Sequence, residues 1–174
     1  MIKFRLYSDK DLEEIFLNKM VSKGYAMTKF RLGVYWFVKC ERGEYTYKID
    51  LVNDKDKNQQ DEYYDLIRET GGEIVQSSGV WVFLRKKGEF ELYTDNESKI
   101  EQYNRIKDMS LILALAQLMA ILTQLIIYSN INIKIMLIIS NIIIFTCTFL
   151  AILLLYQIYK CNIKIENLKK LIGK

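Results

Sequence analysis

Residues Met109–Tyr128 read MSLILALAQLMAILTQLIIY, and residues Ile135–Tyr159 read IMLIISNIIIFTCTFLAILLLYQIY. Neither stretch contains a charged residue. A helix rises about 1.5 Å per residue, so each stretch is long enough to cross a hydrocarbon core of about 30 Å. Only the loop Ser129–Lys134 separates them. The sequence therefore predicts a two-helix transmembrane hairpin over residues 109–159, which anchors the preceding residues 1–108.

The charges around this hairpin predict its orientation. Residues 1–108 hold nineteen Lys and Arg against twenty Asp and Glu, whereas residues 109–174 hold six Lys against one Glu. Five of those lysines follow the second span, and the connecting loop carries only Lys134. The positive-inside rule then places both termini in the cytoplasm of a bacterial cell, with the basic tail 160–174 on the inner headgroups of the cytoplasmic membrane. The nearly neutral first part gives no reason to expect direct nucleic-acid binding.

The first part contains an internal repeat. Gly33–Tyr45 reads GVYWFVKCERGEY, and Ser78–Phe90 reads SGVWVFLRKKGEF. Trp36 falls on Trp81 at an offset of 45 residues, and Gly-Glu followed by an aromatic residue recurs at the same offset. Each copy is typical of a β-hairpin, because an aromatic strand leads to a glycine turn and then to an alternating second strand.

A helix is expected before each hairpin. Ser8 with Asp11 three residues later resembles a capping box, and the glycine pair Gly71-Gly72 would end the second helix. We therefore predict an α+β fold in which an α-β-β-β unit is duplicated, over about residues 8–51 and 54–95. The duplicated unit would form an antiparallel sheet with helices on one face, and the transmembrane hairpin would follow it.

Several segments, taken in order, resemble a known bacterial family. They are Lys23-Gly24-Tyr25, Tyr47–Asp50 (YKID), the strand with Trp81, and Tyr93–Ile100 (YTDNESKI). Over about residues 3–107 the chain resembles the family called domain of unknown function 2812. The resemblance implies a C-terminal pair of membrane spans. It also implies a regulatory or envelope-stress role, because many members are encoded beside PadR-type transcriptional regulators. It implies no catalytic residues.

The composition argues against catalysis. The chain has no histidine, which removes His metal sites and the Ser-His-Asp and Cys-His nucleophile pairs. The carboxylate clusters lie at expected helix starts or in the polar loop Asn53–Gln60, and they are Glu13-Glu14, Asp54 with Asp56, and Asp61-Glu62. In that loop, Asp54 and Asp56 lack the glycine and the closing glutamate of a calcium loop. The three cysteines have no short spacing, so a disulfide is not expected. We predict no enzyme, no metal site and no cofactor.

Aromatic residues are the candidates for a partner-binding surface. Trp36 and Trp81 would line a groove between the two repeats, and Tyr25, Tyr35 and Tyr64 would extend it. The alternative is that these side chains pack in the core, because a buried aromatic removes about 150–250 Å² from water. Exposure of the two indole rings decides between these readings.

Polar and small residues in the two spans are the candidates for helix–helix contacts. These are Ala116, Gln117, Ala120, Gln124, Asn141 and Thr148. Amides and hydroxyls suit interhelical hydrogen bonds, and alanine permits close approach. Two helices are too few to enclose a pore. We therefore expect contact with lipid, together with self-association or docking onto another membrane protein.

These features predict a membrane-anchored cytosolic binding module that acts as a sensor or regulatory adaptor. Its partner would be a cytosolic regulator such as a PadR-type repressor, or a membrane protein. The alternative is an accessory or immunity subunit that docks through its spans onto a transporter or a toxin. The two functions differ in the part that binds, which is the aromatic hairpins in the first and the polar side of the spans in the second.

Overall fold

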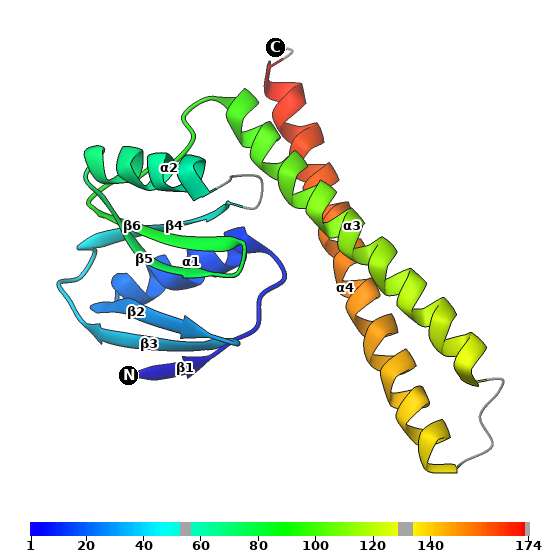
Figure 1. The fold of residues 1–174 in the computed structure, drawn as a ribbon. Coiled ribbons are helices and arrows are strands. Elements are labelled where there is room, and N and C mark those ends of the chain that lie inside the picture. The colour runs from blue at the N-terminus through cyan, green and yellow to red at the C-terminus, as the bar shows by residue number, and fades with distance from the viewer. Residues whose placement is uncertain (53–56, 129–133, 173–174) are drawn as a thin grey trace. The chain divides into compact units, whose positions relative to one another are not determined.

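The computed structural model describes residues 1–52, 57–128 and 134–172, and Figure 1 shows their helices and strands. Asp54 and Asp56 and most of the loop Ser129–Lys134 lie outside the described residues. The chain divides into two compact units, Met1–Asp95 and Asn96–Lys174. The first unit is an α+β domain, and the second is a pair of long helices.

The first unit repeats the order strand, helix, strand, strand. The first copy is β1 (Ile2–Phe4), α1 (Lys10–Val21), β2 (Tyr25–Arg31) and β3 (Val34–Lys39), and the second is β4 (Tyr45–Leu51), α2 (Lys57–Glu69), β5 (Gly72–Ser78) and β6 (Trp81–Lys87). Residues 89–95, where a further strand was expected at Phe90 and Leu92, contain none. The apolar side chains of that segment pack instead into a core cluster with Ile67 of α2.

The six strands form two antiparallel sheets. Their strand orders are β1-β3-β2 and β4-β6-β5. In the first, Ile2 of β1 lies opposite Trp36 of β3. In the second, Leu51 of β4 lies opposite Trp81 of β6. The α+β class and the antiparallel pairing are confirmed, whereas two sheets stand where the sequence predicted one.

The side chain of Gln76 joins the two sheets. Its Oε1 accepts a hydrogen bond from Phe30 N at 2.7 Å, and its Nε2 donates to Phe30 O at 2.7 Å. A β-bulge lies between Ile74 and Gln76, and bulges redirect side chains at strand edges. A side-chain amide therefore replaces backbone pairing between β2 and β5, which explains why one sheet becomes two.

The structural repeat has an offset of 47 residues. α1 and α2 begin at Lys10 and Lys57, and β3 and β6 begin at Val34 and Trp81. Trp36 therefore corresponds to Phe83 and not to Trp81. The alignment on the two tryptophans has an offset of 45 residues, two fewer than the structural repeat. Because strand side chains alternate with a period of two, this shift keeps each side chain on the equivalent face of its strand.

The helices α1 and α2 lie on opposite faces of the β4-β6-β5 sheet. Phe83 packs in one cluster with Leu17 of α1. The neighbours of Phe83, Val82 and Leu84, pack in a second cluster with Ile67 of α2. Successive strand side chains point to opposite faces, so this arrangement corrects the prediction of helices on one face. The continuous apolar run of β6 has the pattern of a strand covered on both faces.

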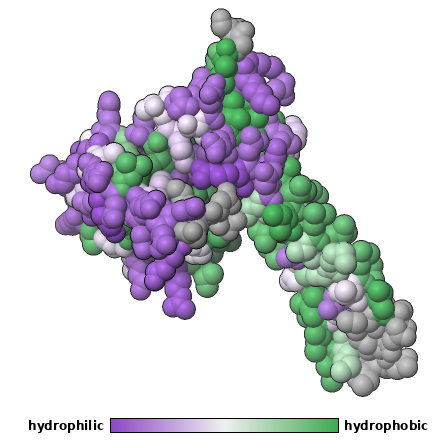
Figure 2. Space-filling model, turned by 45° about the horizontal axis from the view of Figure 1, so that its top comes forward, coloured by the Kyte–Doolittle hydropathy of each residue, from purple (hydrophilic) through white to green (hydrophobic). Residues whose placement is uncertain are grey.

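The second unit consists of α3 (Asn96–Tyr128) and α4 (Lys134–Ile172). Each is long and apolar enough to cross a membrane, and Figure 2 shows hydrophobic residues covering much of the surface of the two helices. Residues 160–172 of the basic tail, which the sequence predicted to lie on the inner headgroups, continue α4 without a break. No glycine or proline occurs between Tyr159 and Ile172 to end the helix.

The two long helices contact each other along a regular seam. Among the more buried positions of α4, nine follow one another in steps of three and four residues, and they are Leu137, Ser140, Ile144, Cys147, Ala151, Leu154, Ile158, Cys161 and Ile165. This spacing is that of a coiled coil, in which every third or fourth side chain faces the partner helix. Many of the other large apolar side chains described on the two helices are exposed, among them Ile112, Leu118, Phe145 and Ile152.

Candidate functional site

Tyr35 and Trp36 point to opposite faces of β3. Tyr35 is 1% exposed, its ring lies 5.3 Å from that of Phe16, and its hydroxyl donates to the carboxylate of Glu13. Trp36 is half-buried on the other face, beside Ile2 of β1. Tyr35 is therefore a core residue, whereas Trp36 belongs to a face that solvent reaches.

The other three aromatic candidates are distributed over two core clusters. Tyr25 and Trp81 pack, partly buried, against the cluster around α1, and Tyr64 packs against the cluster below α2. The hydroxyl of Tyr64 is buried without a hydrogen-bond partner among the described residues. The five candidates do not line one groove, and Trp36 is the one on an exposed apolar face.

That exposed face is the side of the β1-β3-β2 sheet that carries Ile2, Phe4, Trp36 and Val38, which we call the outer sheet face. Ile2 and Phe4 are 61% and 63% exposed, and Val38 is 50% exposed. Direct pairing places Ile2 beside Trp36, and strand alternation places Phe4 and Val38 on the same side. The face therefore carries apolar side chains from β1 and β3, and the Nζ of Lys29 from β2 lies 5.6 Å from the centroid of the Trp36 ring.

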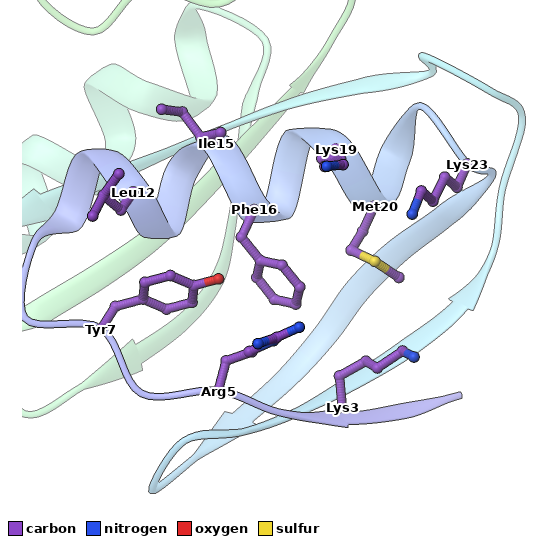
Figure 3. Close-up of a pocket in the computed structure, with 9 residues that line it drawn as sticks. All are labelled: Lys3, Arg5, Tyr7, Leu12, Ile15, Phe16, Lys19, Met20 and Lys23. Carbon is purple, nitrogen blue, oxygen red and sulfur yellow. The ribbon is translucent and has the colours of Figure 1, made fainter.

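A pocket of about 470 Å³ lies between α1 and the segment that begins with β1. Its lining residues are Lys3, Arg5, Tyr7, Leu12, Ile15, Phe16, Lys19, Met20 and Lys23. Figure 3 shows Phe16 and Met20 extending from α1 toward the β1 segment. The N-cap of α1 is Asp9, one residue after the expected cap Ser8, because the carboxylate of Asp9 accepts a hydrogen bond from Asp11 N at 3.0 Å.

Four cations line this pocket, and no carboxylate does; the cations are Lys3, Arg5, Lys19 and Lys23. All four are exposed, and none forms an ion pair with a carboxylate of the described residues. Burial raises the pKa of the Tyr7 hydroxyl, which Arg5 partly offsets. Tyr7 is therefore a neutral hydrogen-bond donor at physiological pH, and the lining as a whole is positively charged.

A half-buried acid, Glu13 of α1, accepts the hydrogen bond from the Tyr35 hydroxyl. Burial raises the pKa of its carboxyl above the ordinary value; the hydrogen bond from Tyr35 partly offsets this effect, and the neighbouring Glu14 adds to it. An acid with a raised pKa in the folded state favours folding at low pH, and this advantage is lost as pH rises through the folded pKa.

We expect the Glu13→Gln variant to lose this pH dependence. Glutamine keeps an acceptor for the Tyr35 hydroxyl but cannot ionise, so the variant should gain stability relative to the native protein between about pH 5 and about pH 8. The measurement is the thermal unfolding midpoint of the full chain in detergent at both pH values. If the unfolding midpoint changed by the same amount between the two pH values in both proteins, ionisation of Glu13 would not destabilise the fold.

The candidate residues of the two spans occupy different sides of their helices. Gln117, Ala120 and Gln124 are half-buried, and Ser140 Oγ of α4 lies 3.3 Å from Gln124 Oε1. Ala116 is exposed. Asn141 and Thr148 are also exposed, and each donates to a carbonyl of its own helix. Gln124 therefore has a polar contact across the helix pair, whereas Asn141 and Thr148 face outward.

The sequence did not predict the pocket, because neither of its two walls, α1 and the segment that begins with β1, carries a recognisable binding motif. The available signal was the alternation of Ile2–Tyr7, in which Lys3, Arg5 and Tyr7 share one side and apolar residues share the other. That pattern does not say that α1 would lie beside the cationic side. Among the described residues, no group of three or more Cys, Asp or Glu is arranged to hold a metal ion.

Two segments that carry the family resemblance meet in the structure. The hydroxyl of Tyr93, from the segment Tyr93–Ile100, donates to Asp50 Oδ2 of β4 at 2.8 Å. A family model described as "Protein of unknown function (DUF2812)" matches residues 9–115, which include both segments. No curated protein and no solved structure matches the chain. Because the match spans more than half of its length, the chain belongs to the DUF2812 family of proteins of unknown function.

Proposed function

We propose that this protein is a membrane-anchored binding module that acts as a sensor or regulatory adaptor. The observation that carries the proposal is the apolar surface along α3 and α4, where large Leu, Ile and Phe side chains are exposed. Each Å² of such surface costs about 25 cal/mol in water, and lipid removes that cost. A continuous helix also satisfies its own backbone groups in a bilayer.

The proposed orientation follows from the ends of the helices. α4 ends with Lys160, Lys164, Lys169 and Lys170, and such clusters prefer the cytoplasmic side, where the leaflet is anionic. The α+β unit precedes α3, so in a two-span hairpin of this orientation the unit would lie in the cytoplasm as well. We propose that it acts there by binding and not by catalysis.

The outer sheet face is the proposed partner surface. Trp36 corresponds to Phe83 in the 47-residue repeat, and α1 covers the sheet face that carries Phe83. The corresponding face around Trp36 is left exposed. Because the equivalent surface in the second repeat packs against a helix, the outer sheet face is suited to bind an amphipathic helix of another protein. The partner that the family resemblance favours is a cytosolic regulator of the PadR type.

Affinity capture tests this proposal. The full-length protein would be purified from its native membranes in mild detergent, beside the variant Phe4→Thr/Val38→Thr. Threonine retains strand propensity while it removes apolar contact area. We expect one protein to accompany the native chain, and its yield to fall at least about tenfold with the variant. The control variant Asn141→Leu/Thr148→Val should retain the partner.

The alternative, a subunit docked through its spans, has one specific observation in its favour. Asn141 and Thr148 present polar side chains on the outward side of α4, where their donors reach Leu137 O at 3.0 Å and Ile144 O at 2.8 Å. These donors are satisfied within α4, but amide and hydroxyl side chains on an outward side also suit hydrogen bonds to a helix of another membrane protein. A partner that is lost with Asn141→Leu/Thr148→Val but kept with Phe4→Thr/Val38→Thr would support this alternative and contradict the first proposal.

A further inference from the structure

We infer that the pocket between α1 and the β1 segment binds an anionic amphiphile, a molecule with one acyl chain and a phosphate or carboxylate head. This inference deepens the proposed function, because it names the ligand that a membrane-anchored sensor would read. It rests on that function only for the source of the ligand. The binding chemistry itself comes from the residues that line the pocket.

The pocket has an apolar wall continuous with the protein core. The ring of Phe16 lies 5.6 Å from that of Tyr7, and Phe16 packs against the core cluster that includes Met20. Leu12 also lines the pocket, and it is 52% exposed. An acyl chain would cover this apolar surface and remove it from water.

The cations lie in the middle and at one end of the pocket (Figure 3). Figure 3 shows Lys3 and Lys23 at the end opposite Leu12 and Tyr7, with Arg5 and Lys19 between them. The lining contains no acid. Charge-assisted hydrogen bonds from ammonium and guanidinium groups are the usual means of holding a phosphate or carboxylate. The pocket is thus polarised along its length, with a site for the head at one end and for the chain at the other.

This polarity selects among ligand classes. A free phosphate would leave the apolar wall uncovered, and a neutral lipid would leave the four cations without a partner. The volume of about 470 Å³ falls in the range of about 300–1,000 Å³ that is typical of small-molecule sites. The ligand can come from two sources, which are a free single-chain amphiphile and an anionic lipid of the surrounding bilayer.

The location of the pocket links it to the proposed partner surface. Lys3 lines the pocket, while its neighbours Ile2 and Phe4 belong to the outer sheet face. The short strand β1 therefore carries both surfaces, one on each side. A ligand that fixes Lys3 and Arg5 would also fix the strand that presents Ile2 and Phe4 to a partner.

The test uses the full-length protein in phosphatidylcholine nanodiscs, with ¹³C-methyl methionine observed by NMR and the Met20 signal assigned through Met20→Leu. We expect dodecyl phosphate to shift the Met20 signal saturably. The variant Lys19→Glu/Lys23→Glu should weaken this binding at least about tenfold, because two cations are replaced by anions. The control Lys57→Glu/Arg68→Glu makes the same charge change on α2 and should alter the affinity less than about twofold.

Four further titrations decide between the ligand classes and sources. Dodecanol and inorganic phosphate should each bind at least about tenfold more weakly than dodecyl phosphate. Nanodiscs that contain phosphatidylglycerol distinguish the sources: a Met20 shift without added ligand identifies bilayer lipid, and its absence identifies a free amphiphile. An acidic amphipathic peptide that displaces dodecyl phosphate with higher affinity would overturn the inference in favour of a protein ligand.

The inference would also be overturned by an unsaturable Met20 shift, by equal binding of dodecanol, or by equal weakening in the control variant. Tryptophan fluorescence, measured on each variant, establishes that the α+β unit remains folded. Partner capture is a separate experiment. A protein that captures its partner through the outer sheet face but does not bind dodecyl phosphate would retain the proposed function and lose only this inference.

Discussion

The Asp50→Ala variant should lose about 3–5 kcal/mol of the free energy of unfolding of the α+β unit. Asp50 is fully buried. Its Oδ2 accepts hydrogen bonds from the hydroxyls of Tyr63 and Tyr93 at 2.8 Å each, and its Oδ1 accepts from Leu51 N at 2.8 Å. Alanine removes the acceptor for all three donors at once. Such a loss is a large share of the roughly 5–15 kcal/mol by which domains are stable.

Denaturant unfolding followed by tryptophan fluorescence measures this loss, because both tryptophans lie in the first unit. Tyr63→Phe and Tyr93→Phe each delete one donor and should each cost about 1–2 kcal/mol. The control is Asp61→Ala, at an exposed position of α2. If Asp50→Ala were no more destabilising than Asp61→Ala, the buried carboxylate would not hold β4, α2 and the segment before α3 together.

The Gly33→Ala variant should cost about 2–4 kcal/mol and distort the segment that lines the pocket. Gly33 has a φ of 81°, a conformation that costs other residues about 1–2 kcal/mol. A Cβ at this position would also lie 2.9 Å from Arg5 O and 2.7 Å from a methyl group of Leu6. The backbone N–H of Arg5 donates to Gly33 O at 2.8 Å, so the β1 segment cannot move away without loss of that bond.

Gly43→Ala separates the two causes. Gly43 has a similar φ of 75°, but a Cβ there would meet no atom within 4 Å. We expect it to cost only the conformational term of about 1–2 kcal/mol. The difference between the two variants measures the steric contact with Arg5 and Leu6. Equal losses would show that the β1 segment yields freely, and the pocket would then not be a rigid feature of the fold.

The sequence predicted those parts of the fold that depend on local pattern. Uninterrupted apolar runs predicted residues 109–128 of α3 and residues 135–159 of α4, because length and composition alone determine whether a helix suits a bilayer. The recurrence of an aromatic strand before a glycine turn predicted the duplication, although the spacing differed by two residues from the structural repeat. Alternating residues in β4 predicted a strand with one face toward the core.

Contacts between distant residues were beyond the reach of these patterns. The amide of Gln76 bonds to the backbone of Phe30, and no periodicity marks a polar side chain that replaces strand pairing. Asp50 appeared in the sequence as the polar residue of an alternating strand, and its two tyrosine partners come from segments 13 and 43 residues away. The fold class was therefore predictable, whereas the joint between the sheets was not.

The candidate site was predictable only in part. The sequence singled out Trp36 as a candidate, but the neighbours that make its surroundings apolar, Ile2 and Phe4, come from a three-residue strand that has little signal of its own. The pocket combines residues from that same segment with α1. Exposed lysines and arginines most often belong to a solvated surface. Only their position around an apolar wall distinguishes the four cations of the pocket.

Alkaline carbonate extraction of membranes that contain the full-length protein tests the central claim most directly. If lipid solvates α3 and α4, the protein will remain in the membrane pellet and will enter solution only with detergent. In sealed inside-out vesicles, added protease should then remove the α+β unit if the proposed cytoplasmic orientation of that unit is right. Release of the intact chain by carbonate, in a form that stays monodisperse in buffer without detergent, would contradict the account.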